Sequence, residues 1–337
     1  MAKIKLKMKI KFRIYPVLLL LAGVILTTAC TEESTDEVSS NDEQRFFDIY
    51  VASSYPDAEP LDNGLYFIEQ TAGQGMVPDT NDWVLVNHVC YMIPEDYVYE
   101  SYIENVADDN RLDLSGIAIY GPYKLLNGSR ADGFTKGLTM MKEGGEATIF
   151  FTSELGYGTT GRGKIGANQS LKYEVELIEV IKDMDAYEQA KIEAFVDTIP
   201  GIDTIHDAGT GAIMYYVIDE ATEGSPVEVD SIIEVAYLGY LTDGRVFDQS
   251  AEDAPFRFKV GDYTAETSPI IGWHLGLEKF KEGEKGRLII PYPLAYGEDG
   301  RVDPSSGLRT IPPYETLVFN VEIVSVEASL DVEEPEP

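Results

Sequence analysis

The chain has few of the residues that build metal centres and covalent cross-links. Its 337 residues include two cysteines and three histidines. His88, His206 and His274 lie far apart in the sequence, so a zinc site made from the usual cysteine and histidine ligands is not expected. No set of residues suggests a catalytic nucleophile or a bound cofactor either. We therefore expect a protein that uses neither a metal nor a cofactor.

Basic residues are also scarce relative to acidic ones. Lys and Arg number 26 against 59 Asp and Glu, which gives a formal net charge of −33. Such a surface repels phosphates, so no nucleic-acid partner is expected. Apolar residues make up 44% of the chain, an ordinary fraction for a globular protein, and the length suggests two or three domains.

The first 29 residues depart from this acidic pattern. They hold six basic residues and no acidic one, and they include the apolar run Val17–Leu26, which is short for a membrane span. Small residues then precede Cys30, an arrangement that resembles the lipobox of bacterial lipoproteins, although Leu26 stands one place earlier than the usual leucine. We expect residues 1–29 to be a signal peptide and Cys30 to carry a lipid. The alternative is an ordinary secretory signal followed by an incidental cysteine.

An acidic, serine-rich stretch follows Cys30 and is predicted to be a solvated tether. Its Glu32-Glu33 pair resembles the surface-export signal of Bacteroidetes lipoproteins. The expected location is therefore the outer membrane, with the lipid on Cys30 as the membrane contact and the protein facing the periplasm or the cell surface. If Cys30 is lipidated, Cys90 has no intrachain partner for a disulfide.

The rest of the chain repeats itself. Three blocks recur in the same order at offsets of 149, 139 and 146, namely 66–75 with 215–224, 133–138 with 272–277, and 172–177 with 318–323. A kept order with changing offsets indicates a duplicated fold whose copies differ in loop length. Each copy also follows a segment of helical periodicity, and Asp185 is a candidate cap for the second such helix. These helices either pack on their domains or act as spacers; the sequence leaves both open.

Each copy is predicted to consist mostly of strands. Residues 232–241, 286–290 and 316–327 have strand periodicity, and 272–280 is the one short helical segment. We expect an α+β fold in which an antiparallel twisted sheet wraps over one short helix. The expected organisation is a signal peptide (1–29), an acidic tether with a lead-in helix (30–62), a first domain (63–182), a helical linker (183–210), a second domain (211–328) and an acidic tail (329–337).

Seven separated blocks of the second copy carry a family resemblance. They lie, in chain order, at 235–239, 243–250, 255–258, 270–273, 295–297, 311–313 and 317–319. In this order and spacing, over about residues 211–328, they resemble the FKBP-type peptidyl-prolyl cis-trans isomerases. The resemblance implies two FKBP-like domains, of which the first is divergent, and proline-containing polypeptides as partners.

The resemblance also implies a binding cleft in the second copy. The matching positions are Tyr237, Phe247, Asp248, Phe256, Phe258, Ile270, Trp273, Tyr296, Ile311 and Phe319. In the family, Trp273 would form the cleft floor, and the Ile270 backbone N–H and the Tyr296 hydroxyl would donate hydrogen bonds to substrate carbonyls. Asp248 would lie at the rim with Tyr237. Two departures, a longer segment at 298–310 and Pro269 before Ile270, are expected to alter substrate preference.

The chemistry of the reaction suits an aromatic cleft. An X-Pro bond isomerises over a barrier of about 18–20 kcal/mol because amide resonance is lost on twisting. The twisted amide has a less polar carbonyl, so an apolar cleft favours it over the planar ground state. The resemblance thus implies an isomerase that assists the folding of exported proteins. The alternatives are a lipid-anchored chaperone or receptor module that binds proline peptides with little turnover, and a surface receptor for glycans or peptides.

The first copy keeps the frame but changes these positions. The replacements are His88 for Tyr237, Tyr99-Glu100 for Phe247-Asp248, Ala131 for Ile270, Phe134 for Trp273 and Tyr173 for Phe319. An altered, more polar cleft and a docking domain without activity are both open. We interpret His88 as a strand residue rather than a proton shuttle, and Cys90 as a buried residue rather than a reactive thiol.

Overall fold

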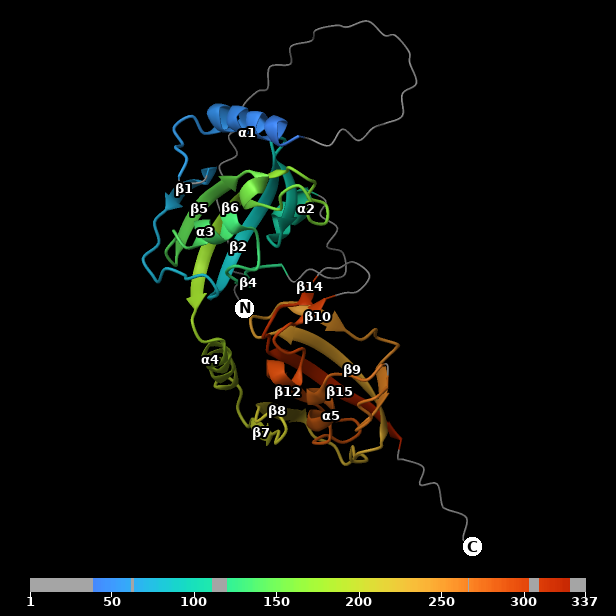
Figure 1. Ribbon diagram of the computed structural model, residues 1–337. Helices are drawn as coiled ribbons and strands as arrows, with labels where there is room; N and C mark the ends of the chain where they lie inside the picture. Colours follow the sequence, from blue (N-terminus) through green and yellow to red (C-terminus); the bar gives the residue numbers. More distant parts are fainter. Residues whose placement is uncertain (1–38, 62–63, 111–119, 266, 303–308, 328–337) are drawn as a thin grey trace, which may run out of the picture. The chain divides into compact units, whose positions relative to one another are not determined.

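The computed structural model describes residues 39–61, 64–110, 120–265, 267–302 and 309–327 (Figure 1). Cys30, the predicted signal peptide and the predicted tail at 329–337 lie outside these residues. Within the described part of the chain, no helix combines the length and the apolar character needed to cross a membrane.

The first copy is built on a six-stranded antiparallel sheet. Its strands are β1 (Tyr66–Thr71), β2 (Trp83–Ile93), β3 (Tyr97–Ser101), β4 (Tyr123–Leu126), β5 (Gly145–Phe151) and β6 (Ser170–Ile181). They are ordered β1-β5-β6-β2-β3, and β4 pairs with the first half of β2. The helices of this copy are α2 (Glu104–Asp109), α3 (Asp132–Leu138) and the 3-10 turn Ser153–Leu155.

The second copy has a seven-stranded sheet of the same plan. Its strands are β7 (Asp203–His206), β8 (Ile213–Glu220), β9 (Ile232–Leu241), β10 (Val246–Gln249), β11 (Phe256–Lys259), β12 (Lys285–Ile290) and β15 (Leu317–Glu327). They are ordered β10-β9-β15-β12-β8-β7, with β11 paired to β9, while β13 (Arg301–Val302) and β14 (Arg309–Ile311) form a separate ribbon. Helix α5 (Ile271–Leu277) and the 3-10 turn Tyr292–Leu294 complete it. Strand β7 lies inside the segment predicted as a linker, so this sheet begins before residue 211.

The matching topologies confirm the duplication and the α+β fold. The strand order β1-β5-β6-β2-β3 of the first copy corresponds element by element to β8-β12-β15-β9-β10 of the second. The predicted strands at 232–241, 286–290 and 316–327 are β9, β12 and β15, and the predicted helix is α5. In each copy the short helix, α3 or α5, packs against the sheet, as Figure 1 shows.

Two glycines bring each short helix close to its sheet. A Cβ on Gly276 would lie 2.7 Å from Leu288 Cδ2, and one on Gly137 would collide with the Ile149 side chain. Bare helix backbone therefore lies directly against β12 and β5. Phe134, which follows Gly133, and Trp273, which follows Gly272, are both buried, with exposed fractions of 1% and 3%.

The lead-in helices α1 (Ser40–Ser54) and α4 (Met184–Val196) pack on their own domains. Phe47 of α1 packs against Phe150 of β5, and Phe195 of α4 packs on a cluster that includes Ile289 of β12. This settles the question that the sequence left open. Asp183, not Asp185, caps α4, because its side chain accepts a hydrogen bond from the Ala186 N–H at 3.0 Å.

A glutamate fixes each lead-in helix to the start of the last strand of its sheet. Glu43 of α1 accepts hydrogen bonds from the Ser153 N–H (2.6 Å), the Ser153 hydroxyl (2.6 Å) and the Ser170 hydroxyl (2.7 Å). In the second copy Glu188 of α4 accepts a longer hydrogen bond from the Thr316 hydroxyl at 3.4 Å. Ser170 and Thr316 correspond at the offset of 146. The duplication therefore includes the helix and its polar attachment, not the sheet alone.

We predict that Glu43→Ala lowers the free energy of unfolding of the first copy by about 3 kcal/mol, because three buried donors lose their acceptor. Urea unfolding followed by Trp83 fluorescence, in a Trp273→Phe background, measures this. Gln44→Ala is the matched control: Gln44 is exposed on the same helix, and its amide bonds Asp48 at 2.8 Å. Equal unfolding midpoints for the two variants would show that Glu43 does not fix the helix.

Candidate active site

The second copy contains a cavity of about 200 Å³ between β9, β10, β11, β15 and the start of α5. Eight of the ten predicted cleft residues line it: Tyr237, Phe247, Asp248, Phe256, Ile270, Trp273, Tyr296 and Phe319. The other two, Phe258 and Ile311, are buried in the adjoining core. Ser268, Pro269 and Arg301 complete the lining. The structure thus gathers residues from six separated blocks of sequence into one cleft.

Trp273 is held in the cleft by surrounding rings. Tyr237, Phe256 and Phe319 meet the indole edge to face, with centroid separations of 5.0, 5.8 and 5.2 Å. Edge-to-face packing is a favoured arrangement of aromatic rings and fixes their orientation. The indole Nε1 is buried and has no hydrogen-bond partner among the described residues. The part of the cleft around Trp273 is therefore aromatic and preorganised.

Asp248 and Tyr237 form a polar pair in the cleft. The Tyr237 hydroxyl donates to Asp248 Oδ2 at 3.0 Å, and the Gln249 N–H donates to Asp248 Oδ1 at 2.9 Å. Burial, followed by the negative charge of Asp248, raises the pKa of Tyr237 well above its usual value. The tyrosine therefore stays protonated, and both carboxylate oxygens accept hydrogen bonds within the protein.

Arg301 lies over Tyr296 in the same cleft. Its guanidinium carbon is 5.6 Å from the centre of the Tyr296 ring. Burial raises the pKa of Tyr296, while the positive charge of Arg301 and its hydrogen bond to Tyr296 act in the opposite direction. The Tyr296 hydroxyl thus remains a neutral donor beside a permanent cation.

A buried histidine anchors the loop that leads into the cleft. His274 Nδ1 accepts a hydrogen bond from the Gly261 N–H at 3.0 Å, so Nδ1 carries no proton. Its Nε2 lies 3.0 Å from the Ser268 hydroxyl, which itself donates to the Asp262 carbonyl. Nε2–H is therefore the donor to Ser268, a residue of the cleft wall. Burial lowers the pKa of His274, which keeps the ring neutral.

The longer segment expected at 298–310 is present, and the paired residues that flank its extra residues correspond to a pair in the first copy. In the first copy Arg162 pairs with Ile165, three residues on; in the second, Arg301 pairs with Ile311, ten residues on. The extra residues therefore lie between the paired residues. Arg301 and the buried Ile311 keep the positions that their counterparts have in the shorter loop.

Strand register confirms two of the residue matches proposed for the first copy, Glu100 with Asp248 and Tyr173 with Phe319. Glu100 pairs with Cys90 as Asp248 pairs with Gly239, and Cys90 and Gly239 correspond at the offset of 149. A Cβ on Gly239 would lie 2.7 Å from Phe247 Cζ. The glycine therefore makes room for an aromatic cleft wall, and a cysteine occupies that position in the first copy. Burial raises the pKa of Cys90 to about 12, which fits a buried residue rather than a reactive thiol.

In the first copy, an ion pair between Arg130 and Glu100 occupies the position that corresponds to the cleft. Arg130, at the position of Pro269, makes two hydrogen bonds of 2.7 Å to the Glu100 carboxylate, and His88 Nε2 lies 3.4 Å from the same carboxylate. Burial raises the pKa of Glu100, but the charge of Arg130 and the hydrogen bonds outweigh it and hold the pKa well below its usual range. His88 is buried in β2, as interpreted. The site is polar and internally paired.

Comparison with known proteins decides the family. A sequence profile described as "FKBP-type peptidyl-prolyl cis-trans isomerase" matches residues 96–178 and 223–324, more than half of the chain. The chain belongs to this family. The matched segments are two, one in each copy, so both copies are FKBP domains.

Individual relatives match shorter stretches. The macrophage infectivity potentiator of Trypanosoma cruzi is 41% identical over 100 residues, 29% of this chain and 45% of that protein. FkpA of Escherichia coli K12 is 35% identical over 124 residues, 36% of this chain and 40% of that protein. The crystal structure of the three FKBP domains of wheat FKBP73 is 20% identical, with a TM-score of 0.31, over 79% of this chain and 96% of that one. The chain thus spans less than half the length of the curated relatives named here.

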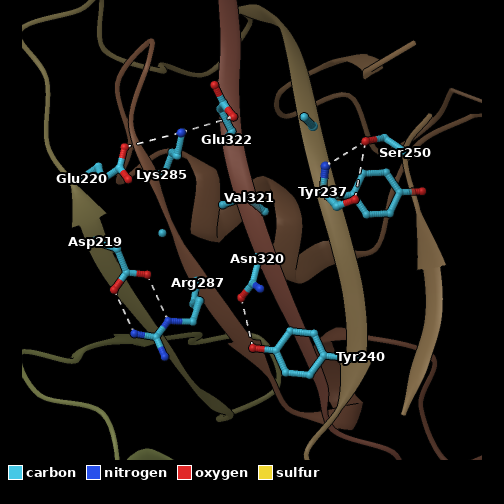
Figure 2. A pocket seen from close by; sticks show the side chains of 12 residues that line it. Asp219, Glu220, Tyr237, Tyr240, Ser250, Lys285, Arg287, Asn320, Val321 and Glu322 are labelled. Carbon is cyan, nitrogen blue, oxygen red and sulfur yellow. Dashed lines mark hydrogen bonds and ion pairs between the residues drawn. The ribbon is translucent and has the colours of Figure 1, made fainter. Parts of the chain in front are cut away.

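A second hollow of the second FKBP domain, of about 620 Å³, lies on the sheet itself, over β8, β9, β12 and β15. Figure 2 shows that its charged side chains face one another: Arg287 bonds Asp219 at 2.8 Å, and Lys285 lies 3.5 Å from Glu220 and 3.8 Å from Glu322. These charges are paired within the protein. The aromatic cleft is therefore the better candidate for an active site.

Three cleft features were not predicted from the sequence. Ser268 and Arg301 line the cavity, and His274 holds Ser268 in place. For Arg301 a signal exists in the repeat, because Tyr157 and Arg162 recur as Tyr296 and Arg301 at an offset of 139. For His274 no local pattern distinguishes it, since its partners are set by the folded loop.

We predict that the second FKBP domain loses stability as the pH falls below about 6.5. The folded-state pKa of His274 lies below its usual value, so the unfolded chain binds the proton first, and stability declines from about pH 6.5 down to that lower pKa. Urea midpoints at pH 7.5 and 5.0, read from Trp273 in a Trp83→Phe background, measure the decline. His274→Gln should flatten it, whereas His206→Gln, on the exposed side of β7, should not. An equal decline in both variants would exclude His274 as its source.

Proposed function

We propose that the second FKBP domain is a peptidyl-prolyl cis-trans isomerase. The observation that carries this proposal is the cleft, in which rings of Tyr237, Phe256 and Phe319 surround the buried Trp273. Such a site holds a proline ring by apolar contact and excludes water from the amide. Family membership and the similarity to FkpA support the same activity.

The proposed catalysis is differential stabilisation of the twisted amide. The planar X-Pro amide is more polar than the twisted one, so moving it into an apolar cleft raises the ground state relative to the transition state. The Ile270 backbone N–H and the Tyr296 hydroxyl are the proposed donors to the substrate carbonyls, and both residues line the cavity. Each 1.4 kcal/mol of this difference accelerates isomerisation about tenfold.

The first FKBP domain is proposed to lack turnover. Its Glu100–Arg130 pair occupies the equivalent place, with two charge-assisted hydrogen bonds of 2.7 Å. A proline ring would have to displace this pair and leave a carboxylate without its partner, which costs several kcal/mol. We propose that this domain contributes to binding clients or to positioning the second domain.

We further propose that the protein assists the folding of exported polypeptides from a lipid anchor on Cys30 in the outer membrane. The sequence pattern around Cys30 and the acidic tether after it support the anchor. Uncatalysed proline isomerisation takes tens of seconds, slow enough to limit folding. An isomerase held at the membrane would meet clients as they arrive.

Asp248→Val and Trp273→Ala are expected to lower kcat/KM for isomerisation of a proline tetrapeptide at least tenfold, because one removes the polar pair and the other the cleft floor. The same variants should slow catalysis of refolding of a proline-limited protein. Phe134→Ala, the matched change in the first domain, should retain the activity of the full chain. Loss of activity only in Phe134→Ala would assign catalysis to the first domain; no activity in the folded wild type would leave a proline-binding module.

We expect Cys30→Ser to release the protein from the membrane when it is expressed in a bacterium with lipoprotein processing. Fractionation of membranes and metabolic labelling with a radioactive fatty acid measure the anchor. Cys90→Ser is the control, because Cys90 is buried in β2 and should leave membrane association unchanged. Equal labelling of the wild type and Cys30→Ser would place the lipid elsewhere or exclude it.

A further inference from the structure

Among the described residues that line the aromatic cleft, Arg301 is the one cation, and its place is fixed by the backbone. Arg301 lies in β13 and pairs with Ile311 of β14, a residue that is 1% exposed. The guanidinium lies over the Tyr296 ring, and the side chain borders the cavity. Since the first copy holds Arg162 over Tyr157 at 5.4 Å by the same pairing with an isoleucine, the frame itself sets this position.

No acidic residue that the structure describes neutralises the charge of Arg301. Among the described residues, no carboxylate oxygen lies within 4.0 Å of it, whereas Arg257 lies 2.7 Å from Glu327 and Arg287 lies 2.8 Å from Asp219. The acid of the cleft, Asp248, accepts hydrogen bonds from Tyr237 and from the Gln249 N–H. Arg301 is exposed and borders a binding cleft in a protein of net charge −33.

We propose that Arg301 determines specificity by favouring clients with a carboxylate side chain next to the isomerised proline. This inference rests on the proposed isomerase function. A guanidinium presents several donors in a rigid plane and bonds carboxylates in charge-assisted pairs. An aspartate or glutamate beside the proline gains such a bond, and a lysine is repelled. The surrounding acidic surface disfavours acidic clients at long range, so the preference arises only at the cleft.

The test compares tetrapeptides that carry glutamate, glutamine or lysine immediately before or after the proline. We expect the kcat/KM for the better-placed glutamate peptide to exceed that for its lysine counterpart by about twofold to fivefold, the range of an exposed ion pair. The ratio should fall with added salt. It should approach one in Arg301→Gln and be partly kept in Arg301→Lys, which retains the charge without the fork. Arg287→Gln, a change outside the cleft, should leave the ratio as in the wild type (Figure 2).

A second measurement separates this inference from the proposed function. Binding of the same peptides is followed through Trp273 fluorescence in a Trp83→Phe background, with and without Arg301→Gln. If the wild type turns over the peptides without a glutamate preference, the inference is overturned and the isomerase function is retained. The same conclusion follows if Arg301→Gln leaves the preference unchanged. Absence of turnover overturns the isomerase function. The dissociation constants then test Arg301: a glutamate preference that is lost in Arg301→Gln supports its role, and any other result contradicts it.

Discussion

The close approach of a seven-residue helix to the sheet is the constraint on which the rest of each FKBP domain depends. A helix this short is not stable in isolation, and two glycines within it weaken it further, by about 1 kcal/mol each relative to alanine. Packing against the sheet must supply the stability that the isolated helix lacks. The glycines make that packing possible, because a Cβ on Gly276 would collide with Leu288. Trp273 reaches the cleft floor only because the backbone beside it lies so near β12.

The two domains show how one frame accommodates different sites. Their strand order, glycine spacing, lead-in helix and Arg–Tyr pair are shared. Within the cleft, Gly239 and Pro269 of the second domain are replaced by Cys90 and Arg130 in the first. The first replacement occupies the space of an aromatic wall, and the second introduces a charge that requires a partner. Glu100, at the place of Asp248, supplies that partner, so the two changes at positions 100 and 130 are physically linked.

The sequence alone predicted the features that repeat along the chain or that alternate between apolar and polar residues. Strands β9, β12 and β15 were predicted from periodicity, and the duplication was predicted from the order of short blocks. The cleft residues were predicted from the family resemblance that such blocks carry. Contacts between distant loops left no such pattern. The attachment of Glu43 to Ser153 and Ser170 spans more than 100 residues, and the role of His274 depends on how the loop at 261–268 folds back on it. The cap of α4 was misplaced by two residues because Asp183 and Asp185 are equally good caps, and only the helix start distinguishes them.

The proposed catalysis by desolvation requires a different cleft from the one that the first domain has. An apolar cleft stabilises a twisted amide only while no strong dipole competes beside that amide. Tyr237 and the Gln249 N–H already hydrogen-bond the Asp248 carboxylate, and Arg301 is exposed to solvent. A partly buried ion pair such as Glu100–Arg130 places charge at the equivalent position, and once both partners are present, removing either one leaves the other unpaired. The electrostatic attraction between Glu100 and Arg130 therefore maintains the paired site of the first domain. In the second domain no such pair is needed at this position, because the rings around Trp273 pack edge to face on one another.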